Sequence, residues 1–297
     1  MLSSVSSIFD PPGFMTPFTV RAKIMFQDEV RRKQGWDQKL TKENEEKWTA
    51  WLKELNAMNN FRIERCIFPS QFKRLVNAKL HHFCDASSKA YVAVSYLRLL
   101  DESGLVHNSF IMARTRLAPI KTTSIPRLEL CAAVLAVSSD AKLGREVSIP
   151  VTSSVFWTDS RIVLQYIASP TRRFHTFVAN RLGTIHRLSL PHQWRHVCSE
   201  DNSADDATRG LTARELIVGG RWKGGPGFLY QSELSWPPMF SHSYDIEGDP
   251  EVRKEITFLA VETQDNGAVD KLLLRYSSWY TLQRAVAWLR ADLQSGS

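Results

Sequence analysis

The sequence predicts an α/β fold built on a mixed five-stranded sheet flanked by helices, and two features support this prediction. Three strand-like runs follow one another over residues 78–85, 90–100 and 107–119, joined by short polar turns, which is typical of an antiparallel meander. After these runs, helical and strand-like segments alternate, which indicates added parallel strands and therefore a mixed sheet.

A helical extension precedes the sheet, over residues 1 to about 70. One helix is expected to start near Pro17 and to stop by Gly35, because proline favours the first turn and glycine ends helices. A second helix places Trp48 and Trp51 on one apolar stripe, which predicts a packing face.

The elements after the meander are predicted in turn from their apolar spacing. They are a helix from Pro126 to about Leu143, a strand over 154–159, helices over 160–168 and 172–188, a strand over 192–197, and a helix that opens near Asn202.

The last part of the chain differs in composition. Beyond residue 218, Gly, Pro and Trp are frequent, which predicts a linker or irregular tail. The chain then ends in an amphipathic helix that carries Leu282, Val286, Leu289 and Leu293 on one face. We therefore expect three parts: 1–70, 78–217 and 218–297.

The overall composition is that of a globular protein, with 43% hydrophobic and 23% charged residues. The four cysteines are far apart and form no CxxC pair, which favours a reduced intracellular protein over a disulfide scaffold or a zinc finger. The N-terminus lacks the features of a signal peptide, and no apolar run approaches the roughly 20 residues that span a bilayer. We expect a soluble protein with no membrane partner.

The net charge of +7 is unevenly distributed along the chain. No acid occurs between Glu102 and Glu129, or between Asp159 and Glu200, while arginines accumulate in both intervals. Such runs suit contact with a phosphate backbone, although a solvated basic face is the alternative. The candidate nucleic-acid-binding residues are Arg114, Arg116, Arg172, Arg173, Arg181, Arg187, Trp194 and Arg195.

Four acids occupy positions that suggest a shared site. Asp85 closes the first strand, and Asp159 ends the fourth strand just before a helix, where it could equally serve as an N-cap. Glu129 lies in an otherwise apolar helix, where an ionised carboxylate is costly unless it is paired, protonated or bound to a metal. Asp205 lies in the first turn of the last helix, where dipole stabilisation is the simpler explanation.

If the first and fourth strands are adjacent and parallel, these four carboxylates meet at one edge of the sheet. Such a cluster is stable only with cations between its members. Oxygen ligands without a Cys/His cluster favour two Mg²⁺ or Mn²⁺ ions over zinc, and ions about 3.5–4 Å apart suit in-line displacement at phosphorus.

The four motifs that carry these acids resemble, in their order, the ribonuclease H domain of BEL/Pao-type LTR retrotransposon polyproteins. They are "FCDASSKAYVAVSYL", "SIPRLELCAAVLAV", "FWTDSRIVLQYI" and "NSADDATRG". The resemblance implies an RNase H-like fold and a metal-dependent endonuclease that cuts the RNA strand of RNA–DNA hybrids. It also implies Asp85, Glu129, Asp159 and Asp205 as the catalytic metal ligands.

The flanks extend the resemblance. Residues 1–70 are similar to the segment that follows the reverse-transcriptase palm, and residues 218–297 resemble the stretch before the integrase region. The resemblance thus implies a pol polyprotein fragment, with reverse transcriptase and integrase as partner modules. It also implies a place in cytoplasmic virus-like particles or in the nucleus.

One departure from the family pattern leaves the activity open. Many ribonucleases H have a histidine in the loop before the last aspartate, whereas residues 198–201 read "CSED" and His196 lies in the strand. The alternative is an inactive or domesticated nucleic-acid-binding module of the same fold. A third hypothesis is a structural protein that docks through its last helix.

Overall fold

Three long strands form an antiparallel meander, and two shorter strands extend it in parallel. They are β1 (Leu75–Ala86), β2 (Ala90–Asp101), β3 (Val106–Leu117), β4 (Ser153–Thr158) and β5 (Trp194–His196). Their order across the sheet is β3-β2-β1-β4-β5, with β4 parallel to both β1 and β5. The predicted mixed five-stranded sheet is confirmed.

The computed structural model describes residues 1–33, 35, 38–64, 66–239, 248–253, 275 and 278–295. Its α-helices are α1 (Leu2–Ser6), α2 (Thr16–Arg31), α3 (Lys42–Ala57), α4 (Ile125–Glu146), α5 (Arg161–Ile167), α6 (Thr176–Leu188), α7 (Asp205–Arg209), α8 (Ala213–Val218), α9 (Arg221–Gly224) and α11 (Trp279–Ser295). Short 3₁₀ turns are η1 (Met58–Asn60), η2 (Pro191–Gln193), η3 (Ser199–Asp201), η4 (Gly227–Tyr230) and η5 (Glu233–Ser235).

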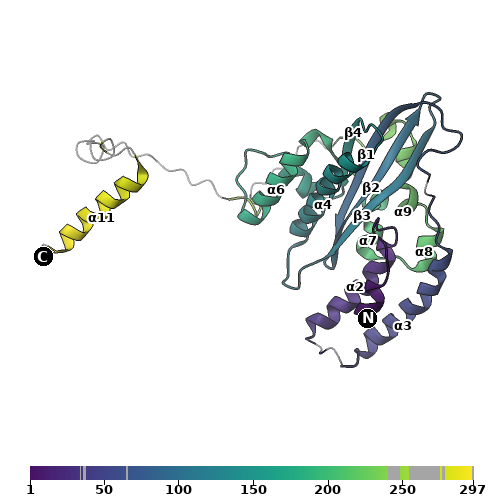
Figure 1. Cartoon of the computed structure of the whole chain (residues 1–297), viewed down its shortest axis with the longest axis horizontal. Helices are drawn as coiled ribbons and strands as arrows, with labels where there is room; N and C mark the ends of the chain where they lie inside the picture. Colours follow the sequence, from purple (N-terminus) through teal and green to yellow (C-terminus); the bar gives the residue numbers. More distant parts are fainter. Residues whose placement is uncertain are drawn as a thin grey trace. The chain divides into compact units, whose positions relative to one another are not determined.

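Helices cover both faces of the sheet (Figure 1). Neighbouring residues of a strand point to opposite faces, so Cys84 packs with α4, α5 and α6, while Phe83 packs with the N-terminal helices and the segment after α8. Phe156 and Trp157 of β4 divide in the same way. Both faces are therefore buried, and sites open to solvent lie at the ends of the strands.

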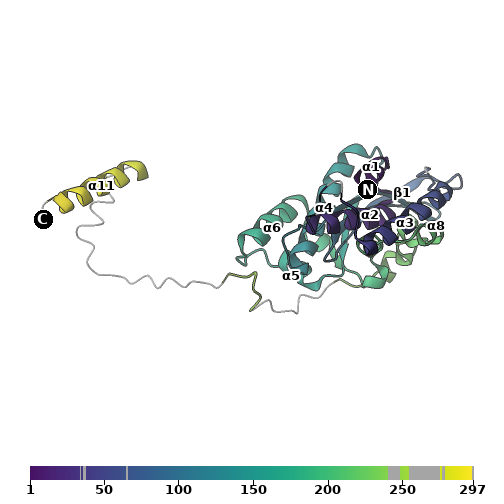
Figure 2. The same cartoon turned by 90° about the horizontal axis from the view of Figure 1, so that it is seen from below.

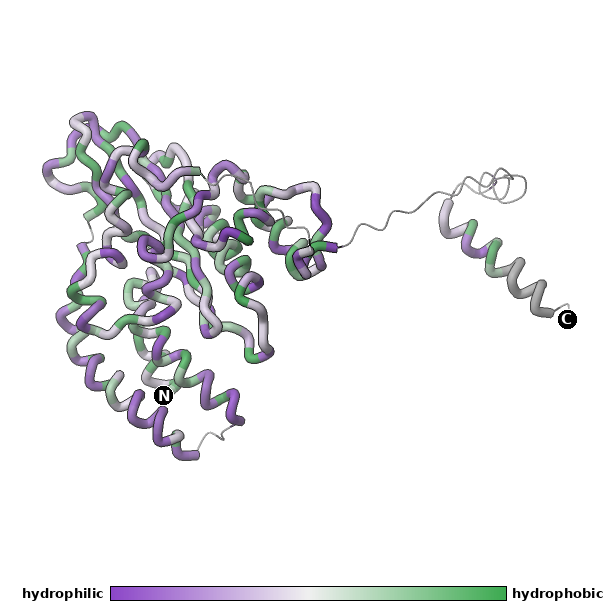
Figure 3. The backbone as a smooth tube through the Cα atoms, turned by 180° about the vertical axis from the view of Figure 1, so that it is seen from behind, coloured by the Kyte–Doolittle hydropathy of each residue, from purple (hydrophilic) through white to green (hydrophobic). Residues whose placement is uncertain are grey.

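The N-terminal helices belong to the same core as the sheet. Phe18 and Trp51 are fully buried and stack with ring centroids 5.0 Å apart, and the Trp51 Nε1 donates to the Phe18 carbonyl at 3.1 Å. Figure 2 shows α2, α3 and α8 close together, and these three helices contact one another. The largely hydrophilic colour of α3 in Figure 3 fits a helix that buries one narrow stripe.

The expected three-part division needs correction, because Met1–Arg253 form one compact unit and Lys254–Ser297 a second. Residues 218–239 are not a linker: Trp222, Leu229 and Trp236 are each at most 5% exposed and lie in the core beside Trp157. A chain rich in Gly and Pro can still pack where its aromatic side chains find an apolar sheet face.

The second unit contributes α11, so the predicted C-terminal helix is confirmed. Val286 is 47% exposed and Leu282 is half-buried. Leu289 and Leu293 lie outside the residues whose side chains the structure describes.

We predict that Trp222→Ala lowers the free energy of unfolding by about 3–5 kcal/mol, because it leaves a cavity in the core. Chemical denaturation of the full chain measures the change. Leu234→Ala, at a side chain that is 98% exposed in the same segment, should change stability by less than about 0.5 kcal/mol. Equal effects of the two variants would contradict a core role for residues 218–239.

Candidate active site

The parallel pairing of β1 with β4 places two of the predicted acids side by side. Cys84 pairs with Thr158 in the sheet register, so Asp85 and Asp159 are the next residues of two adjacent strands. Carboxyl ends of parallel strands are where sites form in α/β sheets. The sequence predicts a shared site if these two strands are adjacent and parallel, and they are.

Asp85 is the most buried of the four predicted acids, at 8% exposed. The Thr208 hydroxyl donates a hydrogen bond to its Oδ2. Burial raises the pKa of Asp85 to about 6, and the negative charges of Asp159 and Asp205 add to this, while the bonds from Thr208 and the Ala86 N–H oppose it.

Glu129 reaches the same place from the start of α4. Ser160 caps α5 by accepting from the Val163 N–H at 3.3 Å, and its hydroxyl donates to the Glu129 Oε2 at 2.6 Å. Burial raises the pKa of Glu129, and the neighbouring Asp159 and Asp85 charges also raise it. Glu129 therefore faces the other acids.

Asp159 lies just beyond β4, and its Oδ2 accepts a 2.6 Å hydrogen bond from the Ser199 hydroxyl. Ser199 belongs to the loop between β5 and α7, which carries no histidine. His196 pairs with Thr158 within the sheet. The loop that packs beside the candidate site thus supplies a hydroxyl to an acid.

Asp205 is the first residue of α7, and its carboxylate forms a 2.6 Å ion pair with Arg209 one turn later. Burial raises the pKa of Asp205, although the positive charges of Arg209 and Arg221 lower it. Asp206 turns away and pairs with Arg221, as expected for adjacent positions on a helix. Asp205 is therefore near the other acids but already has a cationic partner.

Asn202, near which the sequence predicts the start of the last helix, does not cap that helix. The N-cap of α7 is Ala204. Asn202 is fully buried, its Nδ2 donates to the Cys84 carbonyl at 3.1 Å, and its Oδ1 accepts from the Ala204 N–H at 3.2 Å. It ties the start of α7 to the end of β1, and so holds Asp205 near Asp85.

The donor set fits a hard divalent cation, because all four candidate ligands are carboxylates. Among the residues that the structure describes, however, no three His, Cys, Asp or Glu side chains stand ready to hold a metal ion together. Thr208, Ser160, Ser199 and Arg209 each engage one of the acids instead. The four carboxylates thus suit a divalent cation by their chemistry. Asp205 has the weakest support as a ligand, because it already pairs with Arg209.

These four donors were not predicted from the sequence. Ser160 lies two residues after the end of β4, and Ser199 lies next to the loop acid Glu200. Thr208 and Arg209 lie three and four residues after Asp205. Helical spacing signals the Arg209 pair, since residues four apart are neighbours on a helix. The hydroxyl contacts depend on the tertiary fold and have no such signal.

Part of the predicted basic surface does gather on the α4 side of the sheet. The positive charges of Arg116 on β3 and Arg181 on α6 both act on Tyr91, although burial is the larger effect and raises the pKa of Tyr91. The Arg181 guanidinium lies 3.4 Å from the Phe177 ring centroid. Arg114 lies on β3 opposite Ala93, two residues before Arg116.

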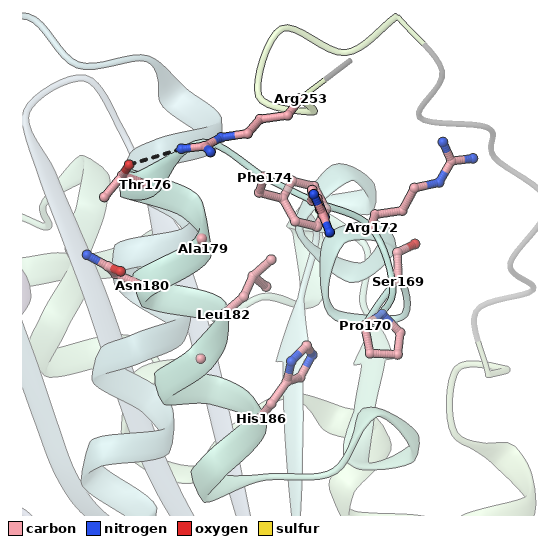
Figure 4. A pocket seen from close by; sticks show the side chains of 12 residues that line it. Ser169, Pro170, Arg172, Phe174, Thr176, Ala179, Asn180, Leu182, His186 and Arg253 are labelled. Carbon is pink, nitrogen blue, oxygen red and sulfur yellow. Dashed lines mark hydrogen bonds between the residues drawn. The ribbon is translucent and has the colours of Figure 1, made fainter. Parts of the chain in front are cut away.

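A second basic group lines a pocket of about 450 Å³ between α6 and the loop before it. Arg172, Arg173 and Arg253 line it, with Phe174 and Leu182 as apolar lining. Figure 4 shows Arg253 reaching toward Thr176 at the start of α6. Arg187, near the end of α6, is exposed.

Two of the predicted nucleic-acid-binding residues are placed differently from expectation. Trp194 is 4% exposed and stacks on Phe156 at 4.8 Å, which contradicts its predicted contact with a duplex. The Arg195 guanidinium lies over the rings of Trp157 and Trp236, at 5.8 and 5.6 Å, so its first contacts are with the core. A residue in an arginine-rich stretch of sequence can therefore face the core when it lies in a strand.

No helix within the described residues is both long and apolar enough to cross a bilayer.

We predict that metal-free protein loses stability as the pH rises from about 4 to 7, because Asp85 has a pKa of about 6 when folded and 3.8 as its ordinary value. Between these values the folded state binds more protons than the unfolded state, so deprotonation favours unfolding. Asp85→Asn should weaken this dependence, leaving the part due to Glu129 and Asp205, and stabilise the chain at pH 7.5 by about 1–3 kcal/mol. Denaturation in EDTA at pH 4.5 and 7.5 measures it, and an Asp85→Asn chain less stable than the parent at pH 7.5 would contradict it.

A model of the Pao retrotransposon-like RNaseH-like domain matches residues 1–160. Three of the acids, Asp85, Glu129 and Asp159, fall inside this range, and Asp205 falls outside it. No curated protein matches the chain.

Solved structures with some likeness include three ribonucleases H. The N-terminal RNase H domain of Rv2228c from Mycobacterium tuberculosis, solved as a fusion with maltose-binding protein, is 13% identical with a TM-score of 0.31, covering 44% of this chain and 94% of that one. RNase H1 from Halobacterium salinarum is 13% identical with a TM-score of 0.30, covering 49% and 100%. LC11-RNase H1, solved with an RNA/DNA hybrid, is 12% identical with a TM-score of 0.31, covering 44% and 93%.

TM-scores this low support no conclusion about this chain. The family match is independent of them and spans more than half of the 297 residues, including three of the four acids placed at the sheet edge. The chain belongs to the Pao retrotransposon-like RNaseH-like domain family.

Proposed function

We propose that this domain is a divalent-metal-dependent ribonuclease that hydrolyses the RNA strand of RNA–DNA hybrids. One observation carries the proposal: Asp85, Glu129 and Asp159 come from three separate elements and act electrostatically on one another at one sheet edge. Their mutual repulsion adds to burial in raising the pKa of Asp85 and of Glu129, and negative charges gathered this way favour a bound cation. Membership of an RNaseH-like family supports the same conclusion.

In this proposal Asp85, Glu129 and Asp159 hold the ions, and Asp205 joins them when it separates from Arg209. Bound Mg²⁺ or Mn²⁺ would activate a water and stabilise the leaving oxygen. Thr208, Ser160 and Ser199 orient the carboxylates through the hydrogen bonds described above. Their role is to fix the acids in place, because a poorly held ligand set loses both affinity and rate.

The arginines on the sheet face that α4 covers are the proposed contacts to the backbone of the duplex. Arg116 and Arg181 lie together beside Tyr91, and Arg114 follows the same strand. Contacts of this kind neutralise phosphates without reading sequence, which suits an enzyme that recognises hybrid shape and 2′-hydroxyls. We extend the proposal to reverse-transcriptase and integrase modules as neighbours in a pol polyprotein, on the family membership alone.

A non-catalytic nucleic-acid-binding module is the second candidate function. The Asp205–Arg209 ion pair favours it, because a ligand held by an arginine is withdrawn from a cation. The loop over residues 198–201 also lacks the histidine common in ribonucleases H. Cleavage of a labelled hybrid with and without Mg²⁺ separates the two candidates, since only the enzyme gives a metal-dependent product.

We predict that Asp159→Asn abolishes cleavage of a labelled RNA–DNA hybrid and leaves hybrid binding unchanged or tighter, because the amide removes one negative charge and a ligand oxygen. Activity should fall by at least about a hundredfold, as for the loss of a group that acts at the reacting centre. Gel analysis of products and anisotropy of binding measure the two effects.

Glu200→Gln is the matched control, because it removes an exposed acid from the loop next to Ser199. It should cleave like the parent chain. Cleavage by purified Asp159→Asn at the rate of Glu200→Gln would contradict the assignment of the metal ligands.

A further inference from the structure

Residues 249–253, called the strap here, lie across the loop between α5 and α6. The His175 N–H donates to the Glu251 carbonyl at 2.9 Å, and the Arg253 N–H donates to the Arg173 carbonyl at 2.8 Å. Phe174 and Val252 form an antiparallel bridge between these bonds. The strap is thus joined to the body as a very short added strand.

Both acids of the strap bind side chains of the body. The Tyr166 hydroxyl lies 2.9 Å from each carboxylate oxygen of Asp249. Glu251 is 8% exposed, and its two oxygens accept from the Arg127 Nε and Nη2 at 2.6 and 2.9 Å. The second contact is a bidentate pair, which is also the geometry in which arginine binds a phosphate.

Arg127 connects the candidate active site with the basic surface. It lies on α4 two residues before Glu129, and its guanidinium is 4.9 Å from the Phe177 ring centroid. Arg181 lies over the same ring at 3.4 Å, and Arg116 acts with Arg181 on Tyr91. The Glu251 carboxylate therefore binds Arg127, and Arg127 lies next to the cationic side chains of Arg181 and Arg116.

We propose that Arg127 binds a backbone phosphate of the RNA–DNA hybrid beside the candidate active site, and that Glu251 occupies this arginine when no hybrid is bound. The strap and the duplex then compete for one position. The inference rests on the proposed function, and it adds Arg127 as a substrate contact and the strap as an intrachain competitor.

The contacts of the strap suit a competitor that can be displaced. Pro250 and Arg253 are exposed and Val252 is only half-buried, so little apolar surface holds the strap. The Arg127 side chain is 36% exposed and the Glu251 side chain 11%, so salt screens this pair from the Arg127 side. A duplex gains from counterion release along its whole backbone and can replace a single carboxylate.

The experiment measures binding of a fluorescently labelled RNA–DNA hybrid to the full chain in EDTA by anisotropy. Glu251→Gln removes the charge and keeps the shape, and it should tighten binding about three- to tenfold, the range for losing a partly exposed charge-assisted pair. Arg127→Gln should weaken binding and cancel the gain when combined with Glu251→Gln.

Glu233→Gln is the matched control, because it changes net charge equally and breaks a 2.6 Å pair with Lys79, which lies on β1 beside Trp236 in the other half of the core. It should bind like the parent chain. Tyr166→Phe frees Asp249 without changing charge and should also tighten binding, which keeps the test decisive if Glu251→Gln folds poorly.

Equal affinity of folded Glu251→Gln, Tyr166→Phe and the parent chain would overturn the strap proposal and leave the nuclease proposal standing. Cleavage by Asp159→Asn would overturn the metal assignment and leave the strap result intact. Failure of every variant to bind hybrid would overturn both.

Discussion

The parallel pairing of β1 with β4 is the constraint on which the candidate site depends. Because Cys84 and Thr158 are partners in the register, Asp85 and Asp159 must leave the sheet at the same edge. A shift of one residue in either strand would send one of the acids to the opposite face. The apolar residues before them, Phe83 and Trp157 on one face and Cys84 and Phe156 on the other, prevent such a shift because both faces are buried.

The same pairing imposes an electrostatic cost on the fold. An acid at 8% exposure beside two others is unfavourable when ionised, which the raised pKa of Asp85 reflects. Hydroxyls from Thr208, Ser160 and Ser199 stabilise the ionised forms in part, and Asn202 fixes the backbone between α7 and β1. Sites that carry such costs are common where function requires them. The arrangement is understandable if the acids serve to bind cations and is otherwise difficult to explain.

Much of the fold and of the candidate site could be predicted from the sequence, because both follow from short-range patterns. Alternation and turn residues identified the meander, and the position of each acid relative to a strand end or helix start placed the acids at one edge. The orientation of the basic residues could not be predicted in the same way. Trp194 and Arg195 lie in a strand of three residues, too short for its alternation to reveal the buried face.

The packing of residues 218–239 and the docking of the strap also could not be predicted from the sequence. Gly and Pro indicated irregular backbone correctly, but irregular backbone can still bury Trp222 and Trp236 against the sheet. The Glu251–Arg127 pair joins residues 124 positions apart, and no local spacing predicts it. Such contacts arise only once the sheet has brought α4, α5 and α6 together.

The central claim is that the acids at the end of β1 and β4 form a divalent-cation site. Titration of Mn²⁺ into the metal-free full chain, with free Mn²⁺ counted by electron paramagnetic resonance, tests it most directly. The account predicts saturable binding in the parent chain and its loss or strong weakening in Glu129→Gln. Absence of bound Mn²⁺ in the parent chain, or equal binding by both proteins, would contradict it.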